Sequence, residues 1–223
     1  MPLAYASPLT DQIAAKVQEK AHIVVTSVKP SPVAGLFEVV YGQKIFYVDK
    51  DVKYAFVGHI FNATGDKDLT AARLKELSKV NWSTLPLKDA VKVVYGKGER
   101  KVAVLTDAKC TYCGVLEQNL ALAGNVTVYN FIAPVMSNSR GIEESIICSK
   151  NPGKAWSDYM TKRIAPMGNV GKCDASKLDR NKALIEKLGF PGTPVLIFSN
   201  GETNPGSMDV EELNRRLGAR SAK

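Results

Sequence analysis

The sequence predicts an α+β chain of two domains joined by a helical linker. Its 223 residues, 45% of them hydrophobic, suffice for one or two cores. The cysteine-free opening is rich in valine, isoleucine, phenylalanine and tyrosine and is cut by turns, which predicts a small antiparallel sheet. A helical pattern that stops before Pro86 follows, and strands and helices alternate after it. We therefore expect domains at 1–65 and 91–223, with a linker helix and strap at 66–90.

The first domain should begin with a helix and continue as short strands. Residues 8–20 place Leu9, Ile13 and Val17 on one helical face, and Ser7 is the expected cap. Three or four short antiparallel strands are predicted, at roughly 33–41, 43–49 and 53–62. A unit of roughly 60 residues buries little surface by itself. We therefore expect this domain to lean on a partner.

The linker carries a second helical pattern at 69–81, with Thr70 as the expected cap. Its expected buried face consists of Leu74, Leu77 and Val80. Trp82, in the segment after it, is expected to be a packing residue.

The second domain alternates between strand and helix patterns. Its expected strands are 91–96, 100–107, 125–134 and 193–201, and its expected helices are 114–124, 176–189 and 209–218. Helical material at 141–165 forms an insertion between them, with Trp156, Tyr159, Met160 and Ile164 on or near one face.

Composition excludes some classes of protein. No run of about 18 apolar residues is present, so no membrane span is expected. The net charge of +8 is scattered along the chain, which favours a solvated basic surface over nucleic-acid binding. The opening "MPLAYASPLTDQ" lacks the basic start and apolar core of a signal peptide, and we expect that such a peptide has been removed.

The stretch "LTDAKCTYCGVLEQNL" places Cys110 and Cys113 two residues apart, after an apolar run and before a helical pattern. A structural zinc site is disfavoured because it needs a second close pair of ligands, and we expect no metal. A purely structural bridge is also disfavoured, because the loop that it would close is very short. The pattern favours a redox centre. The four cysteines permit three pairings, and residue patterns leave these open.

The redox interpretation has a physical basis. At the start of a helix, unpaired backbone N–H groups and the helix dipole favour a negative charge on Cys110. The thiolate is the nucleophile, and Lys109 can add to its stabilisation. Cys113, one turn further on, is placed to attack a mixed disulfide and release the substrate.

A second signal lies 80 residues further along the chain. Thr193 and Pro194 open an apolar strand in "GFPGTPVLIFSNG". Proline cannot donate to a strand ladder, so it belongs at a strand start or edge, and an X-Pro bond can be cis at modest cost. A cis Pro194 would leave the backbone of Thr193 free to pair with an extended substrate chain. The alternative is an ordinary loop proline.

Taken together, these stretches resemble the DsbC/DsbG family of periplasmic thiol:disulfide interchange proteins, over about residues 30 to 218. The matching segments are "PSPVAGLFEVVYGQKIFYVDKD", "VLTDAKCTYCGVLE", "SKNPGKAWSDYM" and "GFPGTPVLIFSNG". Departures occur at Ala108-Lys109 before the first cysteine and at Gly114 after the second, where a larger and often basic residue is common. These departures leave the redox poise open.

The resemblance implies a cystatin-like N-terminal dimerisation domain and a C-terminal thioredoxin fold with a helical insertion. It places the catalytic pair on Cys110 and Cys113 and the cis proline on Pro194. The expected substrate-binding residues are Thr193, Pro194, Thr111 and Tyr112. It also implies a structural disulfide between Cys148 and Cys173, worth about 3 kcal/mol in the chain-entropy model.

The expected activity is disulfide isomerisation in misfolded periplasmic proteins, without a cofactor, by a homodimer that a membrane reductase of the DsbD type keeps reduced. The alternatives are a thiol oxidase, a sulfenic-acid or disulfide reductase of the same fold, and a non-catalytic chaperone. Chaperone activity in addition to catalysis would need apolar surfaces of the dimer that hold unfolded chains. "KIFYV" and "YAFVGHIF" are candidate segments for such surfaces. Core packing is the alternative role of those two segments, and His22 and His59 are expected to be ordinary surface or packing residues.

Overall fold

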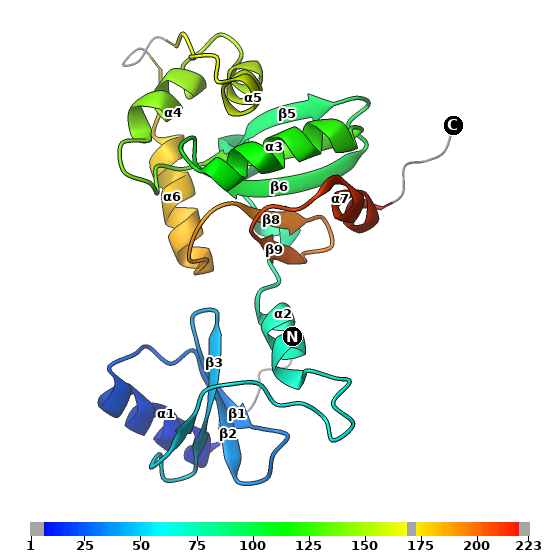
Figure 1. Cartoon of the computed structure of the whole chain (residues 1–223). Helices are drawn as coiled ribbons and strands as arrows, with labels where there is room; N and C mark the ends of the chain where they lie inside the picture. Colours follow the sequence, from blue (N-terminus) through cyan, green and yellow to red (C-terminus); the bar gives the residue numbers. More distant parts are fainter. Residues whose placement is uncertain (1–6, 169–172, 219–223) are drawn as a thin grey trace. The chain divides into compact units, whose positions relative to one another are not determined.

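The computed structural model describes residues 7–168 and 173–218, which form two compact units (Figure 1). The units divide between Ser78 and Lys79, inside the segment 66–90 predicted as the linker. The finer division into 1–65, 66–90 and 91–223 stays a prediction, and the extreme ends of its outer domains lie outside the described residues. In the described ranges, no helix is long and apolar enough to cross a membrane.

The N-terminal unit packs two helices on a small antiparallel sheet. Helix α1 spans Pro8–Ala21, and strands β1 to β4 pair in chain order. The strands span Ser27–Pro30, Leu36–Tyr41, Lys44–Asp49 and Ala55–Phe56, and helix α2 spans Leu69–Leu77. Ser7 caps α1 as predicted, in a reciprocal pair with Thr10. Ile13 and Val17 of α1 are buried against the sheet.

The sheet differs from the predicted one at both edges. Strand β1 lies outside the three predicted ranges, because its four residues, "SVKP", are too few to show a strand pattern. The predicted strand 53–62 shrinks to Ala55–Phe56. The chain then turns toward α2, where the Ile60 N–H donates to the Thr70 hydroxyl at 2.9 Å. That contact replaces further pairing with β3.

Helix α2 is shorter than predicted, and its cap is a different residue. Asp68 caps it by accepting a hydrogen bond from Ala71 N–H at 2.8 Å, while Thr70 lies inside the helix. Val80, expected on the helical face, lies outside the helix and is buried in the C-terminal unit, where its N–H donates to Gly201 O at 2.9 Å. Tertiary packing of Val80 therefore overrides the helical pattern.

The C-terminal unit is a five-stranded mixed sheet in the order β5-β7-β6-β8-β9, with β6 and β7 parallel. The strands span Val91–Tyr95, Arg100–Thr106, Val126–Ile132, Val195–Phe198 and Thr203–Pro205. The helices span Thr111–Ala123 (α3), Arg140–Ile147 (α4), Pro152–Lys162 (α5), Lys177–Leu188 (α6) and Val210–Leu217 (α7). Short 3-10 turns at Trp82–Thr84 and Leu87–Asp89 precede β5.

Helices cover both faces of this sheet (Figure 1). Helices α3, α5 and α7 pack with Val102 and Val104 of β6 on one face. Helix α6 packs with Ala103 and Leu105 of the same strand on the other face. Trp82 is partly buried against this second cluster, which confirms its predicted role as a packing residue. Successive side chains of the buried strand β6 thus point alternately into the two cores.

Two further expectations for the C-terminal unit were wrong. Ile164, expected near the buried face with Trp156 and Met160, is 52% exposed. Helix α5 ends at Lys162 and Arg163 takes a left-handed conformation, so Ile164 no longer follows the helical face. Strand β9 was not predicted, because its three residues carry no strand pattern and it pairs only at the sheet edge.

Candidate functional site

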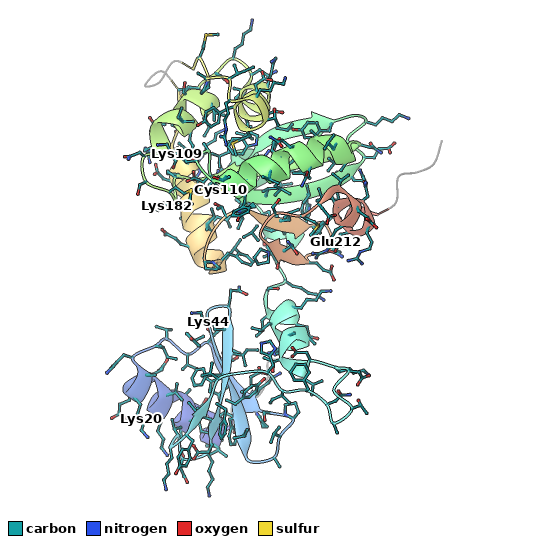
Figure 2. The ribbon with its side chains drawn as sticks, viewed as in Figure 1. Lys20, Lys44, Lys109, Cys110, Lys182 and Glu212 are labelled. Carbon is teal, nitrogen blue, oxygen red and sulfur yellow. A yellow bond between two sulfur atoms is a disulfide. The ribbon has the colours of Figure 1, made fainter. Side chains whose placement is uncertain are left out.

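Cys110 lies between the end of β6 and the start of α3 (Figure 2), and Cys113 lies in the first turn of α3. Cys110 is the N-cap of α3, and its Sγ accepts a hydrogen bond from Cys113 N–H at 3.2 Å. The two cysteines are joined as a disulfide with a Cα–Cα distance of 5.2 Å. When this bond is reduced, the same N–H group and the helix dipole favour negative charge on Cys110 Sγ.

The predicted proline segment lies beside this pair. The Thr193–Pro194 peptide bond is cis, and the Thr193 carbonyl oxygen lies 3.4 Å from Cys110 Sγ. Antiparallel pairing of β8 with β6 brings the two segments together, since Leu105 of β6 pairs with Val195 of β8. Cys110 and Thr193, 83 positions apart in sequence, therefore lie together at the same end of the sheet.

The predicted substrate-binding residues differ in exposure. Cys110 and Cys113 are only 3% and 2% exposed, while Tyr112 between them is 68% exposed. Thr111 is also exposed, Thr193 is half-buried and Pro194 is buried. Lys109 projects its side chain at the surface beside Cys110 (Figure 2). The site thus combines two nearly buried cysteines with an exposed aromatic residue between them.

A buried carboxylate anchors the loop before Cys110. Asp107 is fully buried, and its Oδ1 accepts from Lys109 N–H at 2.7 Å. Its Oδ2 accepts from Val135 N–H at 3.0 Å, Met136 N–H at 2.8 Å and the Ser139 hydroxyl at 2.9 Å. The three bonds at Oδ2 tie the cysteine loop to the segment that follows β7, and the bond at Oδ1 lies within the loop.

A second buried acid lies next to Asp107. Glu143 of α4 is fully buried, and its Oε1 accepts from Ala108 N–H at 3.1 Å. The pKa of Glu143 is raised to about 8, chiefly by burial; the bond from Ala108 N–H and the Arg140 charge lower this pKa, and the Asp107 carboxylate raises it. The side chain therefore holds a proton at neutral pH and braces the loop without a second buried charge.

A third buried acid fixes α3 itself. Glu117 accepts hydrogen bonds from the Tyr95 hydroxyl at 2.6 Å and from Trp156 Nε1 at 3.0 Å. Burial raises the pKa of Glu117, and the two hydrogen bonds oppose that rise. The network joins α3 to β5 and α5, so the helix that begins at the cysteines cannot shift without breaking buried bonds.

The remaining cysteines are also bonded. Cys148 follows α4, and the structure joins it to Cys173 with a Cα–Cα distance of 5.6 Å, within the usual range for a disulfide. Among the described residues, no group of three or more His, Cys, Asp and Glu side chains is arranged to hold a metal ion.

Sequence reasoning missed the supporting acids. Asp107 was part of the quoted "LTDAKC" stretch, but nothing in the pattern indicated that its side chain is buried. Glu117 carried a signal, because it lies four residues after Cys113 on the apolar face of α3. Glu143 carried no such signal, because it lies in the helical insertion, far from the cysteines in sequence, and no local pattern indicates that it packs beside them.

The geometry defines a class of protein: a dithiol–disulfide oxidoreductase built on a thioredoxin-like sheet. Residues 87–220 match the model of the thioredoxin-like domain, and residues 4–71 match that of the disulfide bond isomerase protein N-terminal domain. The predicted α+β two-domain fold is confirmed.

Similar proteins agree with this class. The probable thiol:disulfide interchange protein DsbC of Bordetella avium (strain 197N) is 34% identical over 212 residues, 94% of this chain and 75% of that protein. The thiol:disulfide interchange protein DsbC of Escherichia coli (strain K12) is 28% identical, over 89% of this chain and 83% of that protein. A disulfide interchange protein from Neisseria gonorrhoeae, known from its crystal structure, is 34% identical with a TM-score of 0.56, over 61% of this chain and 100% of that chain. The chain belongs to the DsbC family of thiol:disulfide interchange proteins.

Proposed function

We propose that the chain is a protein disulfide isomerase whose nucleophile is Cys110. The observation that carries the proposal is the position of Cys110 Sγ, which caps α3 and lies 3.4 Å from the Thr193 carbonyl. A helix N-terminus stabilises the thiolate that attacks a disulfide. The neighbouring strand β8 supplies backbone beside the sulfur.

The reaction is an exchange that conserves electrons. The Cys110 thiolate attacks one sulfur of a wrong disulfide, and the other substrate sulfur leaves as a thiolate. A second substrate thiolate then attacks the mixed disulfide, forms the new pair and restores the Cys110 thiolate. If exchange stalls, Cys113 loses its proton, attacks Cys110 Sγ and releases the substrate as a thiol, so the enzyme leaves oxidised.

We assign substrate contact to Thr193, Pro194, Thr111 and Tyr112. Tyr112 and Thr111 are exposed between the cysteines, and Thr193 borders Cys110 on the side of β8. The Cys148–Cys173 bridge is assigned a structural role, because it ties the segment after α4 to the segment before α6.

We further propose a homodimer formed through the N-terminal unit. Strand β4 is a sheet edge, and the segment 54–61 leaves large apolar side chains in water, whereas residues of "KIFYV" are mostly core. The exposed side chains are Tyr54 at 70%, Phe56 at 51%, Val57 at 88% and Phe61 at 54%. An apolar sheet edge is a ready pairing surface. Analytical ultracentrifugation should find a dimer that Phe56→Lys dissociates, and a parent chain that is monomeric at all concentrations would contradict this.

The proposed setting is the periplasm, where the substrates are misfolded disulfide-containing proteins. Each oxidised enzyme must regain two electrons before another round, and a membrane reductase of the DsbD type is the proposed donor. Chaperone activity of the dimer would use the same exposed apolar side chains. Trapping of free thiols in cells should find Cys110 and Cys113 reduced, whereas a lasting oxidised pair would favour a thiol oxidase.

The decisive experiment is reactivation of a scrambled, fully oxidised multi-disulfide protein by the reduced chain. We expect the parent to restore activity and Cys110→Ser to restore none, while Cys113→Ser retains part of the isomerisation but accumulates mixed disulfides. If the parent reduces insulin but leaves the scrambled protein inactive, the chain is a reductase or oxidase of the same fold. If Cys110→Ser still suppresses aggregation, chaperone activity is independent of the thiols.

A further inference from the structure

Three segments meet at the end of the sheet where Cys110 lies, next to the carboxyl ends of β6 and β7 and the amino end of β8. Strand β6 ends there and leads into Cys110, and β8 begins there after Pro194. The parallel neighbour β7 also ends there and leads into residues 133–139. Because β6 lies between β7 and β8, the segment after β7 borders the cysteine loop on the side opposite Thr193.

The segment after β7 exposes apolar side chains at this end of the sheet. Val135 is 39% exposed and Met136 is 46% exposed, while Ala133 just before them is fully buried. Tyr112 and Val115 of α3, which flank Cys113 in the sequence, are also exposed, at 68% and 42%. We call Val135 and Met136 the β7 rim.

The β7 rim is held at a fixed distance from the nucleophile. Ala133 N–H donates to Thr106 O at 3.0 Å, and Cys110 N–H donates to Asp107 O at 3.2 Å. The Asp107 carboxylate accepts from both rim N–H groups, so one buried residue contacts the rim and the cysteine loop together. Rim and loop therefore form one rigid surface.

We propose that the β7 rim contacts the substrate polypeptide and selects segments with an apolar side chain next to the reacting cysteine, with Asp107 as the positioning residue. The proposal rests on the thiol chemistry proposed above and names the substrate class. Cysteines and apolar residues are both usually buried in folded proteins. An apolar side chain beside an accessible disulfide therefore marks a misfolded chain. The flexible thioether side chain of Met136 can pack against apolar side chains of different shapes in different substrates.

The test uses cysteine peptides carried as mixed disulfides with glutathione. One peptide has leucine and phenylalanine beside its cysteine, and the other has serines. The Cys110 thiolate attacks the peptide sulfur and expels glutathione thiolate. Cys113, losing its proton to water, then attacks Cys110 Sγ and displaces the peptide thiolate, which takes up a proton. The protein is oxidised by two electrons, and the mixed disulfide is reduced to two thiols.

The informative variant is Val135→Ser combined with Met136→Ser in the full chain. We expect kcat/KM for the apolar peptide to fall roughly tenfold, the effect of leaving about 50 Å² of apolar surface in water. The rates with the serine peptide and with glutathione disulfide should stay unchanged. Leu122→Ser is the matched control, because Leu122 is 68% exposed on α3 but lies near the other end of that helix from Cys110.

Equal losses for both peptides, or no loss for the apolar one, would overturn the proposal. Isomerisation is judged separately on the scrambled protein, so its failure is distinguishable from failure of the rim. Asp107→Asn tests the positioning role, since its amide must present N–H groups either to Lys109 N–H or to the three donors at Oδ2. The ratio of apolar to serine peptide rates, which a smaller folded fraction cannot change, should fall; an unchanged ratio would remove Asp107 from the proposal.

Discussion

The two units of this chain use their apolar residues differently. Of the bulkiest fully buried side chains among the described residues, only Ile13 belongs to the N-terminal unit. The C-terminal sheet carries two large clusters of buried residues, whereas the two clusters of the N-terminal sheet are small. Around β4, the N-terminal unit instead leaves aromatic and aliphatic side chains in water.

The difference indicates a division of labour. A thiol site needs fixed geometry, and the dense C-terminal core holds Cys110, Asp107 and Thr193 in place. A surface that joins two chains needs accessible apolar area. The N-terminal unit provides it, because the apolar side chains around β4 are exposed and do not belong to its small core. The predictions below test this contrast, from the largest expected effect to the smallest.

Truncation of the dense core should be the most damaging change. Leu120 of α3 is fully buried, so Leu120→Ala should lower the free energy of unfolding by about 2–5 kcal/mol. Urea titration followed by tryptophan fluorescence measures this, since Trp82 and Trp156 both lie in the C-terminal unit. Leu122→Ala, at an exposed position of the same helix, should change the value by less than about 0.5 kcal/mol. Equal effects at the two positions would contradict the described packing.

Loss of the Cys148–Cys173 bridge should be the next largest effect. Replacing both cysteines with alanine should cost about 3 kcal/mol in the chain-entropy model, for a bridge that spans 25 residues. Urea titration of this variant and of the parent, both with Cys110 and Cys113 oxidised, isolates the contribution. Peptide exchange at Cys110 should persist wherever the variant is folded. Its loss in the folded variant would assign the second bridge a role in catalysis.

The buried acid Glu143 should make the C-terminal unit less stable as pH rises. Its pKa is raised from 4.5 to about 8 in the folded chain, so over that range the unfolded chain binds fewer protons. Stability should therefore fall steadily as pH rises across this window and level off above it. Glu143→Gln should make this slope smaller in the oxidised protein, where the thiols do not titrate, while Glu117, whose pKa burial also raises, keeps its own contribution. Parallel pH profiles of the parent and the variant would refute the raised pKa.

Removal of a helix cap in the N-terminal unit should have the smallest effect. Ser7 caps α1, and Ser7→Ala should cost about 1 kcal/mol. Hydrogen exchange of the α1 amides measures it directly, and Ser7→Asp, which restores a capping oxygen, should recover most of the protection. No recovery would mean that the hydroxyl acts outside the cap.

Much of the fold followed from local patterns. The helix after Ser7, the strands around Gly96 and the helix that stops at Gly189 all carry caps, turns or periodicity that act over a few residues. The errors arose where distant contacts decided the outcome. Val80 left its helix to bond Gly201, and the strand after Asp49 stopped at Phe56 as the chain turned toward α2.

The sequence by itself determined the redox pair, the proline segment and the two-domain α+β class, because each depends on neighbouring residue types. Only the tertiary structure decided what surrounds the cysteines. Strand order placed Thr193 on one side of Cys110 and the β7 rim on the other, and burial gave Glu143 its raised pKa. These properties depend on which segments meet at one end of the sheet and which groups lose water, and neither is encoded in a short stretch of sequence.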